Sequence, residues 1–355
     1  MLKHLQKIEG IVNFQVGQGG LFYLDRDNDI HLPNQSRVRI ESKGSFYLIN
    51  NKIVFQSYRG EIQLFDTISG NKIYSNDPSV EKIYIDYRAT PVLENTFFAT
   101  KKTDTAKYGY LDLTSANFHN IGEGISFALP QCGMGFGQKE NTLIGYSLTD
   151  GEALWRFNDF KKFKDFRQEE HDGAMRELLG CTKNSIWLST NSGALIELDF
   201  KTGLTLTTIG FTETELPQLP FIVSEGDHIP YGELMQLDQQ KEEVFGLRDH
   251  YFFHVDLTAK DLRRQYFDIG TSMNAYGINA KYRNTEYPYD ESYIYFCDDR
   301  QGKIGVFDRK HKEVVWSTQL DIEQEGIAQI LEMKFANNRW YVLDRHNTLH
   351  IFEKT

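Results

Sequence analysis

Nearly the same nine residues occur near both ends of this chain, and this recurrence constrains the fold more than any other feature of the sequence. LDRDNDIHL spans Leu24–Leu32, and LDRHNTLHI spans Leu343–Ile351. Five of the nine positions are identical, and two more are conservative exchanges, Ile30 for Leu349 and Leu32 for Ile351. A unit that recurs at both ends of 355 residues indicates a circular array of repeats, in which the two ends are neighbours.

The repeated unit is a short strand, a polar turn and a second strand that ends at a small polar or acidic residue. Eight copies can be aligned, ending at Asn34, Asp66, Asp112, Ser147, Asp199, Asp256, Asp308 and Glu353. Their mean spacing is about 46 residues, which is typical of a β-propeller with four strands in each blade. The fold class is therefore predicted as all-β, a propeller of four-stranded antiparallel blades. Eight blades are preferred, and seven are the alternative if the glycine-rich copy at 133–137 is not a separate blade.

The last copy stops at Thr355 without an outer strand of its own. Residues 2–8 can supply this strand, so that the N-terminal strand completes the last blade and no unpaired edge is left there. We therefore expect one domain over residues 1–355.

The turn that follows the repeated hairpin resembles a known family. SLTDGEALWRF and FDRKHKEVVWSTQ are similar to the quinoprotein-type (pyrroloquinoline-quinone-like) propeller repeat, approximately D-x-x-T-G-x-x-x-W, and FDTISGNKIYS and LDFKTGLTLTTI resemble it more loosely. The resemblance implies a tight turn at Gly70, Gly151 or Gly203, followed by an aromatic residue that docks on the next blade. Enzymes of this family hold a quinone and a calcium ion, often beside a vicinal disulfide, and this chain has no Cys-Cys pair.

Charge and composition exclude several classes of function. The net charge of −11 opposes binding to nucleic acid and to anionic membranes, and no apolar stretch is long enough to cross a bilayer. The three cysteines are far apart, and the N-terminus carries no secretion signal, so a cytoplasmic location is the expectation.

No catalytic, cofactor-binding or metal-binding motif is recognised, and the chain is predicted not to be an enzyme. GMGFG at 133–137 lacks the third glycine of a dinucleotide fingerprint. His31 and His350 occupy matching points of the repeat, which favours a role in strand packing. One alternative is a hydrolase, a lyase or a glycan binder with its site at the central funnel, for which Glu225, Asp227 and His228 are candidates. A further alternative is an envelope assembly scaffold, which would require export.

The hairpin turns carry cations at a shared position. Counting eight residues back from each end marker gives Arg26, Lys139, Arg248, Arg300 and Arg345 in five copies, and Arg59 lies one step beyond Tyr58 in another. We call these six residues the turn cations. Two interpretations remain open: the arginines pair with the adjacent Asp25, Asp249, Asp299 and Asp344, or they accept an acidic segment of a protein partner.

Three long connections precede the fifth, sixth and seventh copies, at 158–173, 211–234 and 274–293. In the first, the spacing of Phe160, Phe163 and Phe166 predicts a short helix with an aromatic stripe. The other two supply candidate partner-binding residues: Leu216, Leu219 and Phe221 in a proline-stiffened segment, and Tyr276, Tyr282, Tyr287 and Tyr289 in a tyrosine-rich one.

These observations predict a non-catalytic propeller that binds another protein through the face with the hairpin turns and the long connections. The partner is expected to be a basic protein or one with an acidic segment. A narrower hypothesis is an inhibitor or immunity-type partner of a toxin or an enzyme.

Overall fold

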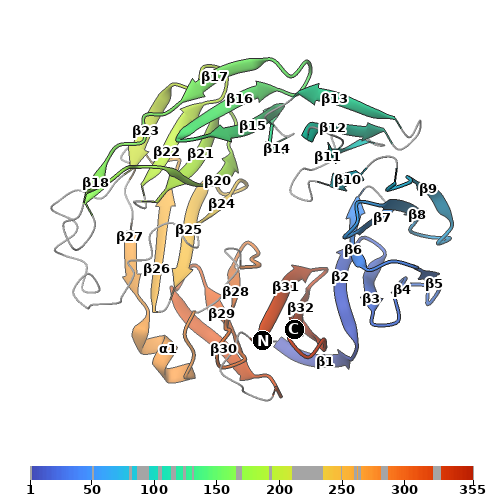
Figure 1. The fold of residues 1–355 in the computed structure, drawn as a ribbon. Coiled ribbons are helices and arrows are strands. Elements are labelled where there is room, and N and C mark those ends of the chain that lie inside the picture. The colour runs from blue at the N-terminus through green and yellow to red at the C-terminus, as the bar shows by residue number, and fades with distance from the viewer. Residues whose placement is uncertain are drawn as a thin grey trace. The chain divides into compact units, whose positions relative to one another are not determined.

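The computed structural model describes residues 2–49, 52–79, 82–85, 96–102, 106–112, 117–122, 125–129, 132–164, 170–191, 194–209, 235–248, 250–259, 262, 265–280, 287–322 and 329–354. Within these ranges the chain forms strands β1 to β33 and one short helix, α1 (Gly270–Tyr276) (Figure 1). The chain divides into two compact units. The N-terminal unit comprises Lys7–Phe157 and Asn347–Leu349, and the C-terminal unit comprises Asn158–His346, Met1–Gln6 and His350–Thr355.

The N-terminal unit contains four antiparallel sheets of four consecutive strands, which we number as blades 1 to 4. Blade 1 is β2 (Ile11–Gly17), β3 (Gly20–Asp25), β4 (Asp29–His31) and β5 (Arg37–Arg39). Blade 2 is β6 (Gly44–Ile49), β7 (Lys52–Ser57), β8 (Ile62–Asp66) and β9 (Lys72–Ser75). Blade 3 is β10 (Lys82–Ile85), β11 (Thr96–Lys102), β12 (Ala106–Asp112) and β13 (Phe118–Gly122). Blade 4 is β14 (Phe127–Leu129), β15 (Met134–Lys139), β16 (Thr142–Ser147) and β17 (Ala153–Phe157).

The C-terminal unit contains blades 5 to 8. Blade 5 is β20 (Met175–Cys181), β21 (Ser185–Thr190), β22 (Leu195–Asp199) and β23 (Thr205–Ile209). Blade 6 is β24 (Gln236–Asp238), β25 (Glu243–Arg248), β26 (Tyr251–Asp256) and β27 (Gln265–Asp268). Blade 7 is β28 (Tyr293–Asp298), β29 (Lys303–Asp308) and β30 (Glu313–Gln319). Blade 8 is β31 (Ile330–Ala336), β32 (Arg339–Asp344) and β33 (Leu349–Lys354), with β1 (Leu2–Ile8) beside β33.

This arrangement confirms the predicted fold class, an all-β propeller with eight blades. The glycine-rich copy at 133–137 forms β15 and belongs to a blade of its own, so the seven-blade alternative is wrong. Strand β1 completes the last blade over the residues that were predicted to do so. That residues 1–355 form one domain stays a prediction.

The burial of each strand follows its position in the blade. The second strand of blade 5 is covered on both faces, and all six residues of β21 are buried. The fourth strands face solvent, and three of the four residues of β9 are exposed. In the C-terminal unit one core cluster extends over blades 6 to 8, with Phe245, Phe296 and Trp340 among its fully buried residues.

Blade 7 departs from the four-stranded pattern. Its described residues form three strands, and Tyr289 makes a single β-bridge to Ile294 of β28. Helix α1 lies against the outer strand β30 and supplies its hydrogen bonds: Val314 N donates to Ser272 Oγ at 3.2 Å, and Tyr276 Oη donates to the Val315 carbonyl at 3.1 Å. The helix thereby covers an edge that would otherwise be open.

The turn between the third and fourth strands has the geometry that the repeat implies. Asp66 Oδ1 accepts the backbone N–H of Ser69 at 2.7 Å, and Asp199 Oδ1 accepts that of Thr202 at 2.8 Å. The next residue has positive φ, +71° at Gly70 and +76° at Gly151, and the equivalent residue of blade 7 is Lys312 at +59°. Because the aspartate side chain accepts these backbone N–H groups, the tight turn does not leave them unsatisfied.

The predicted docking of an aromatic residue on the next blade is found for one of the two tryptophans. Trp316 of β30 packs on Trp340 and Phe352 of blade 8, with ring centroids 6.4 and 5.9 Å apart. Trp155 instead packs on its own blade, where a Cβ added at Gly145 would lie 2.4 Å from its ring. A glycine at the neighbouring position of β16 therefore lets the indole lie flat on the sheet.

No helix among the described residues is long and apolar enough to cross a membrane.

Candidate functional site

The turn cations lie on the turns between the second and third strands of the blades and, in blade 7, between β28 and β29. In two of these turns the residue before the turn holds the backbone. Asp25 Oδ1 accepts the N–H groups of Asp27 and Asp29, both at 2.9 Å. Ser57 Oγ accepts those of Arg59 at 3.3 Å and Glu61 at 3.0 Å. Such side-chain caps make the turns rigid supports for the residues that follow.

In three blades, a second hydrogen bond fixes the residue that lies eight positions before the end marker. Arg26 N donates to the Gly10 carbonyl at 3.0 Å, Tyr58 N to the Lys43 carbonyl at 3.1 Å, and Arg345 N to the Gln329 carbonyl at 2.9 Å. In each case the acceptor precedes the first strand of the same blade. The position eight residues before the end marker is therefore one structural position.

The turn cations differ in how exposed their side chains are and in whether they contact other residues of the protein. Arg59, Lys139 and Arg300 are exposed, and they form no ion pair with any residue that the structure describes. Arg26 is also exposed, but its Nε and Nη2 both lie 3.2 Å from the Asn347 carboxamide oxygen when that amide is oriented to accept. Arg345 is half-buried, and the Arg248 side chain lies outside the described part. Arg59, Lys139 and Arg300 are thus the cations open to an external ligand.

The aspartates beside the turn cations bind other groups. Asp25 Oδ2 lies 2.6 Å from His31 Nε2, and Asp344 Oδ2 lies 2.9 Å from His350 Nε2. Asp299 Oδ1 accepts the N–H groups of Gln329 at 2.7 Å and Ile330 at 3.2 Å. Asp25 and Asp299 thus accept hydrogen bonds from hairpin and inter-blade neighbours, and no ion pair joins either of them to the adjacent arginine among the contacts of the described residues. Asp249 lies outside the described residues.

The histidine bonds have an electrostatic consequence. Burial raises the pKa of Asp25, but the hydrogen bond from His31 and the backbone N–H of Asp29 outweigh it, and the pKa is lowered from its usual value. His31 lies in β4 and stacks on Tyr23 with centroids 4.3 Å apart, and His350 is 1% exposed in β33. Both histidines therefore pack within their strands, as predicted from their matching places in the repeat.

The tyrosine-rich segment 274–293 is largely anchored to its own scaffold. Tyr276, in α1, is 40% exposed and bonded to Val315. Tyr287 is 1% exposed in the core, which removes its side chain from the predicted binding surface. Tyr289 is half-buried, and its ring meets Phe245 edge-on at 5.0 Å. Tyr282 lies outside the described residues.

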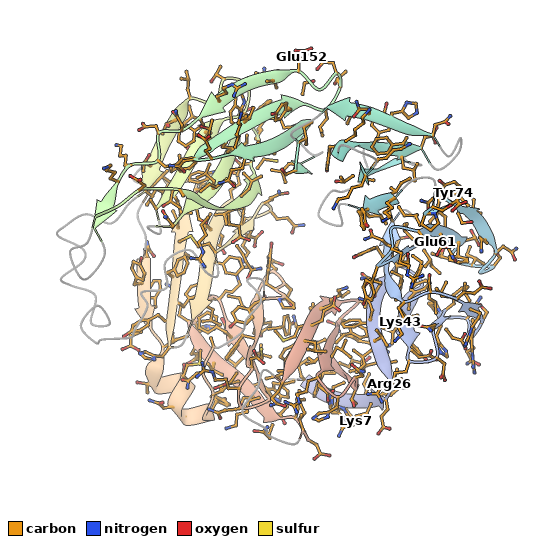
Figure 2. The ribbon with its side chains drawn as sticks, in the orientation of Figure 1. Lys7, Arg26, Lys43, Glu61, Tyr74 and Glu152 are labelled. Atoms are coloured by element: carbon orange, nitrogen blue, oxygen red, sulfur yellow. The ribbon has the colours of Figure 1, made fainter. Side chains whose placement is uncertain are left out.

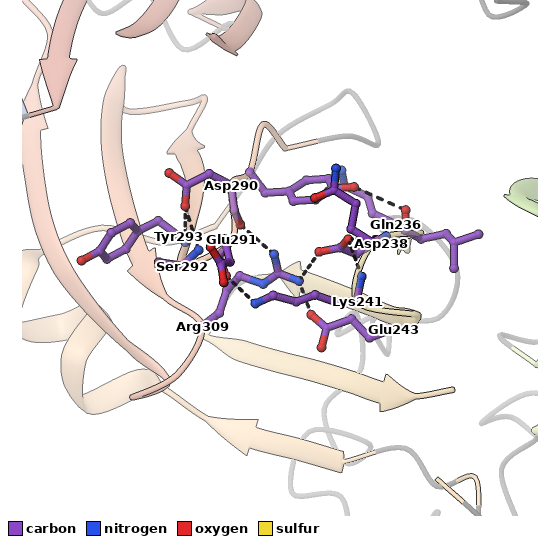
Figure 3. Close-up of polar contacts among 12 residues, drawn as sticks. Gln236, Asp238, Lys241, Glu243, Asp290, Glu291, Ser292, Tyr293 and Arg309 are labelled. Carbon is purple, nitrogen blue, oxygen red and sulfur yellow. Dashed lines mark hydrogen bonds and ion pairs between the residues drawn. The ribbon is translucent and has the colours of Figure 1, made fainter. Parts of the chain in front are cut away.

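A buried arginine explains why this segment is held down. Arg309, in the turn between β29 and β30, has a side chain that is 4% exposed. Its Nη2 donates to Asp238 Oδ2 at 2.8 Å and to Glu243, and its Nη1 donates to the Asp290 carbonyl at 2.7 Å (Figure 3). The guanidinium also lies 4.7 Å from the Phe245 ring centroid. One cation thus ties blade 6 to the segment before β28.

Asp290 and Gln236 complete the anchoring. Burial raises the pKa of Asp290, but hydrogen bonds from Lys354 and Tyr295, both at 2.7 Å, outweigh it and lower the pKa. Gln236 Nε2 donates to the Tyr287 carbonyl and its Oε1 accepts the Tyr287 N–H, both at 2.9 Å (Figure 3). Sequence reasoning missed this network, because its members come from three blades.

Two hollows adjoin the same region of the C-terminal unit. A groove of about 530 Å³ lies between α1 and β30, where Tyr276, His311 and Glu313 are among its lining residues. A second hollow of about 600 Å³ is lined by residues 237–241 and 289–291. Two of its carboxylates, Asp238 and Asp290, are already paired with Arg309 and Lys354.

The segment 158–173 is not the predicted helix. Phe163–Lys164 (β18) and Glu170–His171 (β19) pair as two short antiparallel strands. Phe160 is buried, at 7% exposure, so it packs on the protein. The helical spacing of the three aromatic residues was outweighed by strand pairing, in which Phe163 itself takes part opposite His171. Phe166 lies outside the described residues.

The segment 211–234 lies outside the described residues, and with it Leu216, Leu219 and Phe221. The candidates for the enzymatic alternative, Glu225, Asp227 and His228, lie there too. In the part of the chain that is described, no three His, Cys, Asp or Glu side chains gather closely enough to hold a metal ion.

One residue of interest was overlooked at the sequence level. Tyr58 interrupts the series of turn cations, yet it occupies their structural position and is 70% exposed. The available signal was the register itself, which gives Tyr58 the same place as Arg26 and Arg345.

No family model matches the chain, and comparison with curated proteins gives no match. Solved structures of similar fold include the C-terminal WD40 domain of Sif2, with TM-score 0.59 and 12% identity over 100% of this chain and 99% of that one. Sqt1 of Saccharomyces cerevisiae has TM-score 0.57 and 10% identity over 99% of this chain and 98% of its own. The computationally designed Ika8 protein has TM-score 0.54 and 14% identity over 99% and 98%. At such identities the likeness is one of propeller fold alone.

Proposed function

We propose that this chain is a non-catalytic β-propeller that binds another protein through the hairpin turns between the second and third strands of its blades. One observation carries the proposal: these turns are capped by side chains and present exposed cations without ion-pair partners in the described part of a chain whose net charge is −11. Rigid turns lose little entropy on binding, and unpaired arginines suit carboxylates of a partner.

The proposed binding residues lie on turns of both units. In the N-terminal unit these carry Arg59 and Lys139, and in the C-terminal unit they carry Arg300 and the backbone position of Arg248. The segment 211–234, with Leu216, Leu219 and Phe221, is proposed as an apolar contact with the partner. Tyr276 and Tyr289 are proposed as further contacts, through their rings and hydroxyl groups. We further propose that the protein is cytoplasmic and that its repeats are of the quinoprotein type. The capped turns at Asp66 and Asp199 support that repeat class.

Affinity purification from the native lysate tests the proposal. Wild-type protein is expected to retain a stoichiometric partner that is lost as salt rises, because exposed charge pairs are screened. A variant with Arg59→Ser, Lys139→Ser and Arg300→Ser should lose it. The matched control removes three exposed lysines from other turns and an outer strand, Lys72→Ser, Lys183→Ser and Lys310→Ser, and should keep it. Equal retention by both variants, or no partner with wild type, would refute the proposal.

The narrower form of the proposal is that the partner is a toxin or an enzyme which this chain inhibits. The acidic net charge supports it, since long-range attraction speeds encounter with a basic partner. Titrating the purified partner with this chain and measuring the partner's activity checks the inhibition. Unchanged activity at saturation would contradict this form and leave the broader one standing.

A further inference from the structure

We propose that the turn between β7 and β8 in blade 2 is a docking site for an acidic peptide segment of the protein partner. The site consists of Tyr58 and Arg59 in the turn, with Lys43 and Lys82 beside them; we call it the Tyr58 patch. This inference rests on the proposed function and adds the place and the chemistry of the contact.

The Tyr58 patch is open to solvent. Tyr58 is 70% exposed, and Lys43, Arg59 and Lys82 are exposed as well. Tyrosine and arginine are enriched among the residues that dominate binding energy at protein interfaces. An exposed tyrosine offers a large contact area with few rotatable bonds, so its immobilisation costs little entropy.

Three segments that are distant in the sequence meet at the patch. Tyr58 N donates to the Lys43 carbonyl at 3.1 Å, and Ile83 N donates to the Gly60 carbonyl at 3.0 Å. A Cβ at Gly60 would lie 2.7 Å from the Cβ of Lys82, so Lys82 is packed directly on the turn. Lys43, labelled in Figure 2, comes directly before β6. Lys43 and Lys82 therefore flank the turn from the two segments it contacts.

The backbone of the turn is preorganised. Besides the two bonds from the turn to Ser57 Oγ, the buried Asn76 donates through Nδ2 to the Gly60 carbonyl at 3.2 Å and accepts the Ile62 N–H at 2.6 Å. Gly60 has φ +87°, a conformation that glycine adopts without strain. The side chains are thus presented from a fixed support, which lowers the entropy lost on binding.

Two acids on the same segments, Glu61 and Glu41, form no ion pair with a described cation of the patch. The Glu61 carboxylate binds neutral donors, Ser42 Oγ at 3.1 Å and the Gln63 amide. Glu41 is exposed and forms no ion pair with a described residue. Lys43, Arg59 and Lys82 likewise form none within the described ranges. Among the described residues, Lys43, Arg59 and Lys82 are thus cations without an ion-pair partner on a chain of net charge −11.

This chemistry selects an acidic peptide with an apolar side chain. The Arg59 guanidinium can take a carboxylate in a two-pronged hydrogen bond, and the lysines add point charges on both sides. The Tyr58 ring provides a surface for a neighbouring apolar residue. An extended polyanion fits less well, because its many phosphates would face the negative charge of the remaining surface.

Site-specific crosslinking locates the contact. Tyr58 is replaced by the photo-crosslinking residue p-benzoylphenylalanine, the full-length protein is irradiated in native lysate, and the crosslinked peptide is sequenced by mass spectrometry. The control carries the same group at Ile68, which is 77% exposed on another turn of blade 2. We expect a crosslink from position 58 to an Asp- or Glu-rich segment and none from position 68. A crosslink to a segment without acids, or to RNA, would overturn the inference.

A binding assay tests the charge pattern with a defined probe, a fluorescein-labelled peptide of alternating Glu and Leu. Its neutral counterpart, alternating Gln and Leu, should bind at least about tenfold more weakly. Arg59→Gln should weaken the Glu-Leu peptide about tenfold, whereas Lys183→Gln, at an exposed turn of blade 5 outside the proposed binding residues, should change it less than about twofold. Glu41→Gln should strengthen binding, because it removes a repulsive charge. Equal affinity of the two peptides, no measurable binding of either, or no effect of Arg59→Gln would overturn the inference.

The two proposals fail in different ways. A partner that is retained by wild type, lost by the triple serine variant and never crosslinked from position 58 would overturn the Tyr58 patch and leave protein binding through the turns intact. Absence of any retained partner would overturn both. Circular dichroism of each variant confirms that the fold is kept, which is expected for substitutions at exposed side chains.

Discussion

The Nε2 atom of His350 lies 2.9 Å from Oδ2 of Asp344, and both side chains are buried. The same pair recurs in blade 1 between His31 and Asp25, at 2.6 Å, with more of each side chain exposed. The shared stretch at the two ends of the chain therefore encodes a structural unit: an aspartate that begins a hairpin turn and a histidine six residues later that reaches back to it.

The two histidines should differ in their effect on stability. His350→Ala removes a partner from a fully buried carboxylate and is expected to lower the free energy of unfolding by about 2–3 kcal/mol. His31→Ala acts at the equivalent but more exposed pair and should cost about 1 kcal/mol or less. Urea denaturation at neutral pH measures both variants. Equal losses would show that burial does not govern the strength of this pair.

Acid should destabilise the protein through the capped turns. A hydrogen bond from Thr202 lowers the pKa of Asp199, and hydrogen bonds from Ser69 lower that of Asp66. The folded chain then binds fewer protons than the unfolded chain, so this stability is complete above the unfolded pKa near 4 and is lost as pH falls through the folded values. Unfolding midpoints of wild type and Asp199→Asn, measured from about pH 6 to about pH 3, should converge at the acid end. A constant difference across this range would contradict the assignment.

Removing the buried guanidinium should be among the most damaging single changes. Arg309→Met leaves Asp238 and Glu243 without their cation, and we expect a loss of about 3–5 kcal/mol in the free energy of unfolding at neutral pH. The loss should shrink in acid, because protonated carboxyls need no partner. The exposed neighbour provides the control: Lys310→Met should stay within about 0.5 kcal/mol of wild type. Comparable losses for both variants would refute the role of the buried network.

Two glycines at the same turn position should respond differently to alanine. Both have positive φ, but a Cβ at Gly151 would lie 1.5 Å from the Ile121 carbonyl oxygen, whereas one at Gly70 would lie 3.0 Å from a Val38 methyl group. Gly70→Ala should cost about 1–2 kcal/mol for the left-handed conformation, and only a side-chain methyl group of Val38 has to shift. Gly151→Ala should cost clearly more or prevent folding, because backbone must move. Thermal unfolding of the two variants decides, and equal midpoints would contradict the prediction.

Local patterns explain what could be predicted of the fold. The strands, the eight hairpins and the closing strand at Leu2–Ile8 follow from alternation, turn residues and the repeat, which depend on neighbours in sequence. The predicted helix at 158–173 failed because aromatic residues at i, i+3 and i+6 do not determine structure when part of the segment pairs as β18 and β19.

The sequence alone could not predict which charged side chains pair within the protein. Asp25 could be assigned to the adjacent Arg26 on spacing alone, yet the hairpin brings His31 to it instead. Arg309 meets Asp238 from 71 residues away, and Lys354 meets Asp290 from 64. No local pattern predicts such pairs, because they form only when blades stack.

The amino-acid sequence alone predicted the propeller, its eight blades and the turn position that Tyr58 shares with Arg26 and Arg345, because all of these follow from short-range periodicity. Tertiary structure decided which charged side chains are buried and paired, as Arg309 is, and which remain open to a partner, as Arg59 does. The physical reason is that hydrogen bonding within strands and turns is local, whereas desolvation and charge pairing depend on what distant segments bring together.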